Sequence, residues 1–119
     1  MWVIGLAYVH RDNSVAYGIY NDDTMVGMVI LLELNNKYSF SEFFIADDYQ
    51  NQGFAKEAVK CIIDKFKKER KYSNIMIFVH ESNKVALHLY EKSGFKITGN
   101  PTWSKFFMSW KWIYNINLL

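Results

Sequence analysis

Residues 50–55, Gln-Asn-Gln-Gly-Phe-Ala, combine features that suit the binding of an anion. They lie between an apolar strand at 40–45 and a long amphipathic segment, so a tight loop that opens a helix is expected. The first N–H groups of a helix lack intrahelical partners, and the helix macrodipole adds partial positive charge there. Gly53 would let a phosphate approach the backbone, and Asn51 tolerates a left-handed conformation. The loop is therefore a candidate phosphate site, with an ordinary strand-to-helix turn as the alternative.

A second pair of residues, Asn83 and Tyr90, follows a further apolar strand. They are seven residues apart, or two helical turns, and are expected on one helix face with Val85, Ala86 and Leu89. That face is mostly turned inward, where a tyrosine is more often a core residue than a ligand contact. Asn83 also suits the position of a helix N-cap. Each of the two residues thus has a structural and a functional interpretation.

The remaining reactive side chains exclude several chemistries. No Cys/His/Asp spacing predicts a metal site, and no Ser/His/Asp arrangement predicts a nucleophile with its base. Cys61 is the only cysteine, which excludes an intrachain disulfide. It lies at the flank of an apolar helical stripe and is expected to be a packed small side chain.

Three strands in the first half of the chain lead to these residues. Apolar runs at 15–20, 25–34 and 38–46 are separated by Asn-Asp-Asp and Asn-Asn-Lys turns. Consecutive strands joined by short turns are typical of an antiparallel meander.

The second half of the chain changes period. Three elements follow in order: a helix at 54–70, a strand buried on both faces at 74–80, and a helix at 84–93. They predict a right-handed βαβ unit whose helices begin at the carboxyl ends of the strands, where ligands bind. Two more strands, 95–99 and 105–112, are predicted around a Gly-Asn-Pro turn. The fold class is therefore α/β with a mixed sheet: a meander, one βαβ unit and a C-terminal hairpin.

Length and composition limit the class of protein. A chain of 119 residues, half of them hydrophobic and 18% aromatic, fits one folded domain. The net charge of +2 is too small to indicate nucleic acid. No apolar run reaches the ~18 residues of a membrane span, and the first residues lack the basic region of a signal peptide. We therefore expect a soluble, cytoplasmic protein.

Order and spacing of these motifs resemble the GCN5-related N-acetyltransferase (GNAT) family over about residues 15–112. Residues 50–55 are similar to the family's Gln/Arg-x-x-Gly-x-Gly/Ala pyrophosphate loop, and Glu42-Phe43-Phe44-Ile45 to the strand that pairs with the pantetheine arm. Residues 83–90, followed by Gly94-Phe95, match the family's Asn-x(6)-Tyr helix and the Gly-Phe after it. The branch that acetylates small amines, including diamines and polyamines, is the most similar.

The resemblance implies a role for each matching residue. Acetyl-CoA would be the cosubstrate, with its pyrophosphate on the backbone of the loop and helix start: Gln50, Asn51, Gln52, Gly53, Phe54, Ala55 and Lys56. The strand residues Phe43, Phe44 and Ile45 would face the pantetheine arm, and Asn83 would anchor it from the other wall. Tyr90 would protonate the departing thiolate, since a phenol of pKa ~10 can reprotonate a thiolate whose acid has a pKa of ~8.5.

The acceptor must lose a proton before it attacks, because a free alkylamine has a pKa near ~10. Glu42 is the candidate base and His80 the reserve, although Glu42 is equally interpretable as an exposed strand carboxylate. Asp47 and Asp48 are expected to set the turn, and His88 to face solvent. The resemblance thus implies direct acetyl transfer to a small primary amine in a ternary complex. The alternatives are a CoA-binding sensor or subunit without catalysis, and an interaction module without a cofactor.

One departure from the family concerns the N-terminus. The family has a strand and two helices before the segment that begins here near Val15, so an uncovered sheet edge is expected at 15–20. Apolar residues at both ends have no evident place in a monomer: Trp2, Val3, Ile4, Leu6, Trp110, Trp112, Ile113, Ile116 and Leu118. We therefore expect a homodimer.

Overall fold

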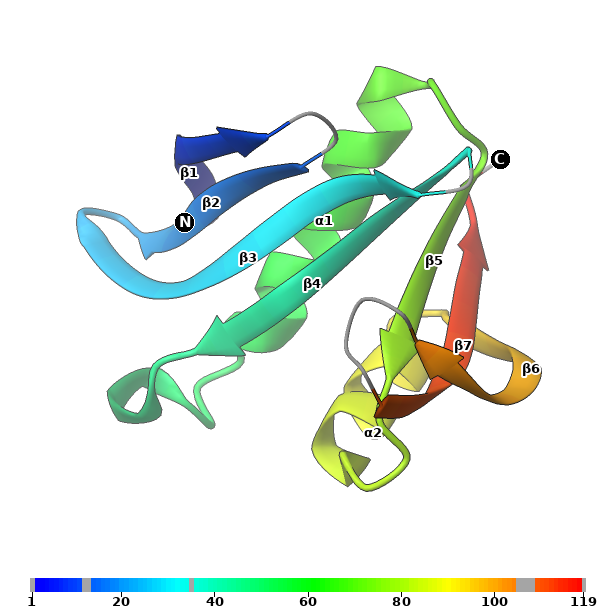
Figure 1. Ribbon diagram of the computed structural model, residues 1–119. Helices are drawn as coiled ribbons and strands as arrows, with labels where there is room; N and C mark the ends of the chain where they lie inside the picture. The colour runs from blue at the N-terminus through cyan, green and yellow to red at the C-terminus, as the bar shows by residue number, and fades with distance from the viewer. Residues whose placement is uncertain (1, 12–13, 35, 105–108, 119) are drawn as a thin grey trace.

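A single seven-stranded sheet with two helices organises the chain, in the order β1-β2-β3-β4-β5-β7-β6 (Figure 1). The computed structural model describes residues 2–11, 14–34, 36–104 and 109–118. The elements are β1 (Trp2–Arg11), β2 (Ser14–Asn21), β3 (Thr24–Leu34), β4 (Lys37–Ile45), a 3₁₀ turn (Asp47–Tyr49), α1 (Phe54–Glu69), β5 (Asn74–Val79), α2 (Lys84–Lys92), β6 (Lys96–Ser104) and β7 (Ser109–Asn117).

The pairing of the strands confirms the predicted mixed α/β sheet. Strands β1 to β4 form an antiparallel meander, and β5, β7 and β6 are also joined by antiparallel pairs. Only β4 and β5 are parallel, and their register contains one pair, Tyr38 with Ile75. The two halves of the sheet are therefore joined at one end of β4 and β5 and diverge toward the other (Figure 1).

Both helices lie on the same face of the sheet. The crossovers β4-α1-β5 and β5-α2-β6 both move along the sheet in the direction from β4 toward β6. Because such crossovers are right-handed, their helices lie on the same face of the sheet. The apolar stripe of α1 packs there, with Ala58, Val59 and Ile62 fully buried. Tyr90 of α2 belongs to the same core and contacts Phe40 of β4, with ring centroids 5.8 Å apart. Neither helix of the described chain is long and apolar enough to cross a membrane.

The N-terminal region differs from the expectation of an uncovered edge at 15–20. Residues Trp2–Arg11 form β1, which pairs antiparallel with β2 from Trp2↔Asn21 to Arg11↔Ser14. The expected absence of a first strand is thus wrong, and the edge of the sheet is β1. This strand is hard to predict from the sequence because its apolar residues do not alternate regularly, and its register with β2 shifts twice. Only residues 12 and 13, which lie outside the described residues, separate β1 from β2.

The C-terminal hairpin and tail also differ from expectation. Gly99, Asn100 and Pro101 lie within β6, at two register shifts, and not in the turn. The predicted start of the second strand, residues 105–108, lies outside the described residues, as does Leu119. The tail expected to lack a place in the monomer forms β7, which pairs with both β5 and β6. Its Tyr114 is fully buried, because a strand in the sheet interior needs apolar residues on its covered face.

Candidate active site

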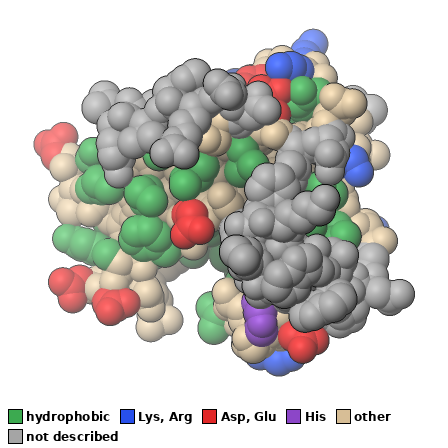
Figure 2. Space-filling model, viewed as in Figure 1, with side chains coloured by type: hydrophobic (Ala, Val, Ile, Leu, Met, Phe, Trp, Pro, Cys, Tyr) green, Lys and Arg blue, Asp and Glu red, His purple; other side chains and the backbone are tan. Residues whose placement is uncertain are grey.

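The diverging ends of β4 and β5 are the geometric centre of the candidate site. Apart from the Tyr38–Ile75 pair, the register of β4 and β5 contains no further paired residues. Both α1 and α2 begin shortly after these strands end, so their N-termini lie at the same edge of the sheet. In the space-filling view a notch separates the end of β4 from α2 (Figure 2). An extended ligand could therefore occupy the position of a missing strand between β4 and β5.

The loop before α1 has the backbone geometry of an anion site. Asn51 and Gly53 both have left-handed backbones, with φ of 62° and 83°, as the sequence predicted from their residue types. The first intrahelical bond of α1 runs from the Glu57 N–H to the Gly53 carbonyl at 3.2 Å, so the N–H groups before Glu57 receive no helical carbonyl. A Cβ added to Gly53 would meet nothing within 4 Å, which leaves room for a ligand above the backbone.

Two glutamine side chains fix the shape of this loop. The Gln50 Nε2 donates to the Ile45 carbonyl at 2.9 Å and to the Asp47 carboxylate at 3.2 Å. The Gln52 Nε2 donates to the Asp48 carbonyl at 3.3 Å. These bonds direct both side chains back toward the 3₁₀ turn, so the loop presents its backbone outward. Residues 50–53 and Lys56 are exposed, whereas Phe54 and Ala55 are half-buried against the core.

A bulge in β4 marks the edge of the gap. Glu42 has a left-handed backbone with φ of 49°, and the β3–β4 register shifts between the Met28 and Ile30 pairs. A non-glycine residue in this region stores strain and occurs preferentially at functional sites. The bulge reverses the alternation of the strand: Phe43 and Ile45 pack toward the core, and Glu42 and Phe44 are exposed. Glu42, the candidate base, is exposed at the bulge.

Tyr90 is buried and surrounded by aromatic rings. Its exposed fraction is 7%, and its ring centroid lies 5.8 Å from that of Phe40 and 5.7 Å from that of Phe95. The inward orientation expected for this residue is confirmed. Burial raises the pKa of the Tyr90 phenol, because the phenolate would lose its hydration. The side chain is therefore protonated throughout the physiological pH range.

The start of α2 differs in part from the predicted face. Asn83 is the N-cap, and its Oδ1 accepts a hydrogen bond from the Ala86 N–H at 3.2 Å. Its amide NH₂ lies in solvent, because the residue is exposed. Val85 is 82% exposed, so the expectation that it faces inward with Tyr90 is wrong. The first turn of α2 projects beyond the core, and only later turns pack on it.

His80 makes a contact that the sequence did not reveal. Its Nδ1 accepts from the Ser82 N–H at 3.1 Å and lies 2.6 Å from the Ser82 Oγ. Since Nδ1 is the acceptor, the proton of the neutral ring is assigned to Nε2. The nitrogen that could accept a proton, Nδ1, is thus the one that Ser82 contacts. A His-x-Ser pattern at the end of a strand is the only sequence signal for this pair. His88 is exposed, as expected.

Metal-ligating clusters and the cysteine are the remaining candidates for chemistry at the site. Among the residues that the structure describes, no group of three or more His, Cys, Asp or Glu side chains converges as a metal site would require. Cys61 is half-buried on α1, and burial raises the pKa of its thiol. The polar groups of the site are thus the loop backbone, Glu42, Asn83 and His80, with the buried phenol of Tyr90.

Comparison with known proteins identifies a family and a shared fold. Residues 2–95 match the acetyltransferase (GNAT) family. The spermidine N(1)-acetyltransferase of Escherichia coli K12 is 28% identical over 94 residues, which are 77% of this chain and 50% of that protein. The chain spans about half the length of the curated relatives it matches.

Two solved structures share the arrangement of the sheet. The acetyltransferase of Bacillus subtilis in complex with CoA has a TM-score of 0.76 at 22% identity, over 90% of this chain and 78% of that one. The spermidine N-acetyltransferase of Vibrio cholerae in complex with CoA and spermine has a TM-score of 0.76 at 23% identity, over 90% and 67%. At such identities the likeness shows a common fold.

Proposed function

The chain belongs to the acetyltransferase (GNAT) family, and on that premise we propose that it transfers an acetyl group from acetyl-CoA to a small primary amine. The observation that carries the proposal is the junction of two features at one edge of the sheet. The left-handed loop at Asn51 and Gly53 offers backbone N–H groups to an anion, and β4 and β5 separate beside it. Acetyl-CoA combines a pyrophosphate with an extended arm, so one molecule fits both features.

The proposal assigns a contact to each of the matching residues. The pyrophosphate would lie on the backbone from Asn51 to Lys56, above the unobstructed Gly53. The arm would pass between β4 and β5, along the backbone of Phe43, Phe44 and Ile45. The exposed amide NH₂ of Asn83 would donate to the arm while its Oδ1 still caps α2. Gln50 and Gln52 would act through the loop they stabilise, since both side chains bond to the protein.

The reaction requires the acceptor nitrogen to lose two protons and the sulfur to gain one. An alkylammonium first loses a proton to a base, and the neutral nitrogen then attacks the thioester carbon in a ternary complex. A C–N bond forms, the C–S bond breaks, and sulfur leaves with the electron pair as a thiolate. The second proton leaves the nitrogen as the amide forms, and one proton reaches the thiolate. The products are the N-acetylamine and CoA.

Glu42 and Tyr90 are the residues proposed for these protons. Glu42 lies at the bulge and is exposed, so it can accept a proton from an entering ammonium or through water. Tyr90 keeps its proton because burial raises its pKa. Its phenol is thus suited to donate a hydrogen bond that stabilises the developing thiolate, until a proton released by the acceptor nitrogen reaches the sulfur. A CoA-binding protein without catalysis is the second candidate, favoured by the burial of this phenol.

Two measurements test the proposal. Titration calorimetry with CoA should give a saturable 1:1 isotherm, and thiol release from acetyl-CoA should rise on addition of a primary amine. The amine panel should include putrescine, spermidine and aromatic amines. Binding without amine-dependent thiol release would leave the non-catalytic candidate, and absence of CoA binding would contradict both.

The proposal includes a cytoplasmic location and self-association. The fold accounts for both sequence features that favour a dimer, because β1 pairs with β2 and the tail forms β7. A dimer would instead use the outer edge of β1, which no other described strand pairs. Fractionation of the expressing cells tests the location.

A further inference from the structure

The face of the sheet opposite the helices offers a second approach to the gap between β4 and β5. Val29 and Leu31 pack in the core on the helix side. The alternate residues Gly18, Met28 and Phe44 are register partners of one another, so they share the opposite face, called here the open face. No helix of the described chain covers it (Figure 1). Since α1 and α2 occupy the other face, no described helix stands between the open face and the gap.

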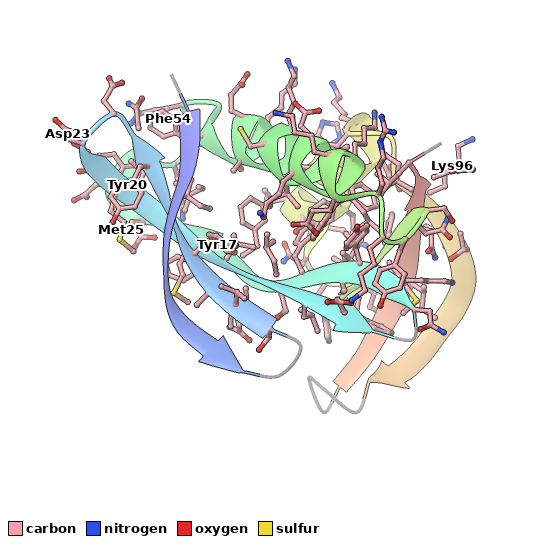
Figure 3. The ribbon with its side chains drawn as sticks, turned by 90° about the horizontal axis from the view of Figure 1, so that it is seen from above. Tyr17, Tyr20, Asp23, Met25, Phe54 and Lys96 are labelled. Carbon is pink, nitrogen blue, oxygen red and sulfur yellow. The ribbon has the colours of Figure 1, made fainter. Side chains whose placement is uncertain are left out.

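Four apolar side chains gather at one end of the open face. A Cβ at Gly18 would lie 2.8 Å from the Tyr20 ring and 3.4 Å from the Met25 sulfur, which places both side chains on that face. Met28 and Phe44 complete the group, called the Met25–Phe44 patch. Figure 3 shows Tyr20 and Met25 beside the turn that joins β2 to β3, and Figure 2 shows apolar side chains gathered over this face.

The patch is exposed and continuous with the candidate active site. Met25 is 46% exposed and Phe44 is 51% exposed, which is unusual for large apolar side chains that share a surface. Phe44 lies two residues after the bulge at Glu42, on the strand that borders the gap. Asp23 lies in the turn just before Met25, and Glu42 lies on β4 with Phe44. Both carboxylate side chains are exposed. An apolar surface with acidic groups beside it complements a cation attached to an apolar body.

We propose that the acceptor is a primary amine with an apolar body, such as an aralkylamine, whose ring or chain covers the Met25–Phe44 patch. Its nitrogen would enter the gap beside Glu42. The proposal rests on the proposed acetyltransferase function and specifies its substrate class. A polyamine carries several charges and little apolar surface, so it would leave Met25 and Phe44 in water.

The test compares two amines on the same enzyme preparation. The ratio of kcat/KM for 2-phenylethylamine to that for spermidine is measured by thiol release at saturating acetyl-CoA. The wild-type ratio should exceed about 10, and Met25→Ser and Phe44→Ser should each lower it roughly 5- to 10-fold, mainly through KM for 2-phenylethylamine. A ratio is insensitive to the fraction of protein that is active, so general damage does not change it.

Ile97→Ser is the matched control. Ile97 is 48% exposed, close to Met25 and Phe44, and lies on β6. It follows Lys96, which Figure 3 shows on the other side of the molecule from Met25. The control should leave the ratio unchanged.

Three results would overturn the proposal in distinguishable ways. Equal or better use of spermidine, or a ratio that neither variant lowers, would contradict the substrate class and leave the acetyltransferase function intact. Absence of thiol release with every amine would remove the function itself. A wild-type dimer in sedimentation that Met25→Ser dissociates would show that a second copy, and not the acceptor, covers the patch.

Discussion

Tyr90 has two possible roles, one as a core residue and one in catalysis. It packs between Phe40 and Phe95, and burial raises its pKa. A core role needs only the ring, which phenylalanine also has, whereas a catalytic role needs the hydroxyl. The two interpretations therefore differ in what the loss of one oxygen does.

Tyr90→Phe should lower kcat by about 10²-fold or more, because the thiolate would lose its hydrogen-bond donor. The affinity for acetyl-CoA and the melting temperature should change little, since the ring stays in place. Steady-state thiol release and calorimetry measure these quantities. Normal turnover by Tyr90→Phe would make Tyr90 a core residue only.

Gly53→Ala should weaken acetyl-CoA binding by at least about 10-fold, because a methyl group would occupy the space above the loop backbone. The methyl meets no protein atom within 4 Å, so the folding cost comes only from the left-handed backbone, φ 83°, at about 1 kcal/mol. Asn51→Gly is the control, since glycine accepts φ 62° and adds no atoms. Unchanged calorimetric affinity in Gly53→Ala would count against this anion site.

At the scale of elements, the close contact of β3 with the end of β4 positions the site. Gly27 pairs with Ile45, and a Cβ there would contact the Phe44 carbonyl oxygen too closely and lie 3.1 Å from the Ile45 Cα. Only glycine therefore allows β3 to approach β4 at the point where the pantetheine-facing backbone begins.

Gly27→Ala should lower the free energy of unfolding by about 1–3 kcal/mol and weaken acetyl-CoA binding, since β4 must move. Gly18→Ala provides the comparison, because its Cβ would meet the far end of the flexible Tyr20 side chain. Urea denaturation measures the difference. Equal stability of the two variants would show that the strands adjust without cost.

How far the sequence predicts these elements depends on how local their signals are. The meander, α1, α2 and the left-handed Asn51 and Gly53 follow from periodicity, turn residues and capping, all short-range features. The strand β1 and the position of β7 inside the sheet depend on long-range pairing, which no local pattern encodes. For the same reason Tyr90 and Asn83 could be named, while the Met25–Phe44 patch, which joins three strands, could not.

At the scale of the whole molecule, a polar cluster fastens the end opposite the site. The Glu33 carboxylate of β3 accepts from the Tyr72 hydroxyl at 2.6 Å and pairs with the Lys71 ammonium at 2.7 Å. The Lys71 N–H donates to the Tyr38 hydroxyl at 2.7 Å, and the Tyr38 ring stacks on Phe66. This cluster joins the α1–β5 connection to β3 where β4 and β5 pair, so it closes one end of the sheet.

The hydrogen bond from the Lys71 side chain, followed by that from Tyr72, holds the pKa of Glu33 below its ordinary value of 4.5. A lowered carboxyl pKa contributes stability above pH 4.5 that is lost as the pH falls through the folded-state pKa. Glu33→Gln should therefore destabilise the protein at pH 7, and the difference should shrink below pH 4.5. Thermal unfolding against pH measures it. Glu69→Gln, which breaks a single pair with Lys65 at 3.2 Å, should have a smaller effect at either pH, because Glu33 also accepts from Tyr72.

Sedimentation at micromolar concentration addresses the assembly. A homodimer formed through the outer edge of β1 should have a sedimentation-derived mass of about twice the 14.1 kDa of one chain. Val3→Pro in β1 should shift the distribution toward the monomer, because proline has no backbone N–H to donate from this edge strand. A single 14.1 kDa species in the wild type would contradict the dimer.

The interior position of β7 also orders the steps by which the chain can fold. The strands β1 to β4 are neighbours in sequence as well as in space, so they can assemble while the chain is still emerging from the ribosome. β5 gains its antiparallel neighbour only when residues 109–117 are available, because β7 separates it from β6. Until then one edge of β5 stays unpaired, and the nascent chain has an interval in which chaperones would be expected to bind it.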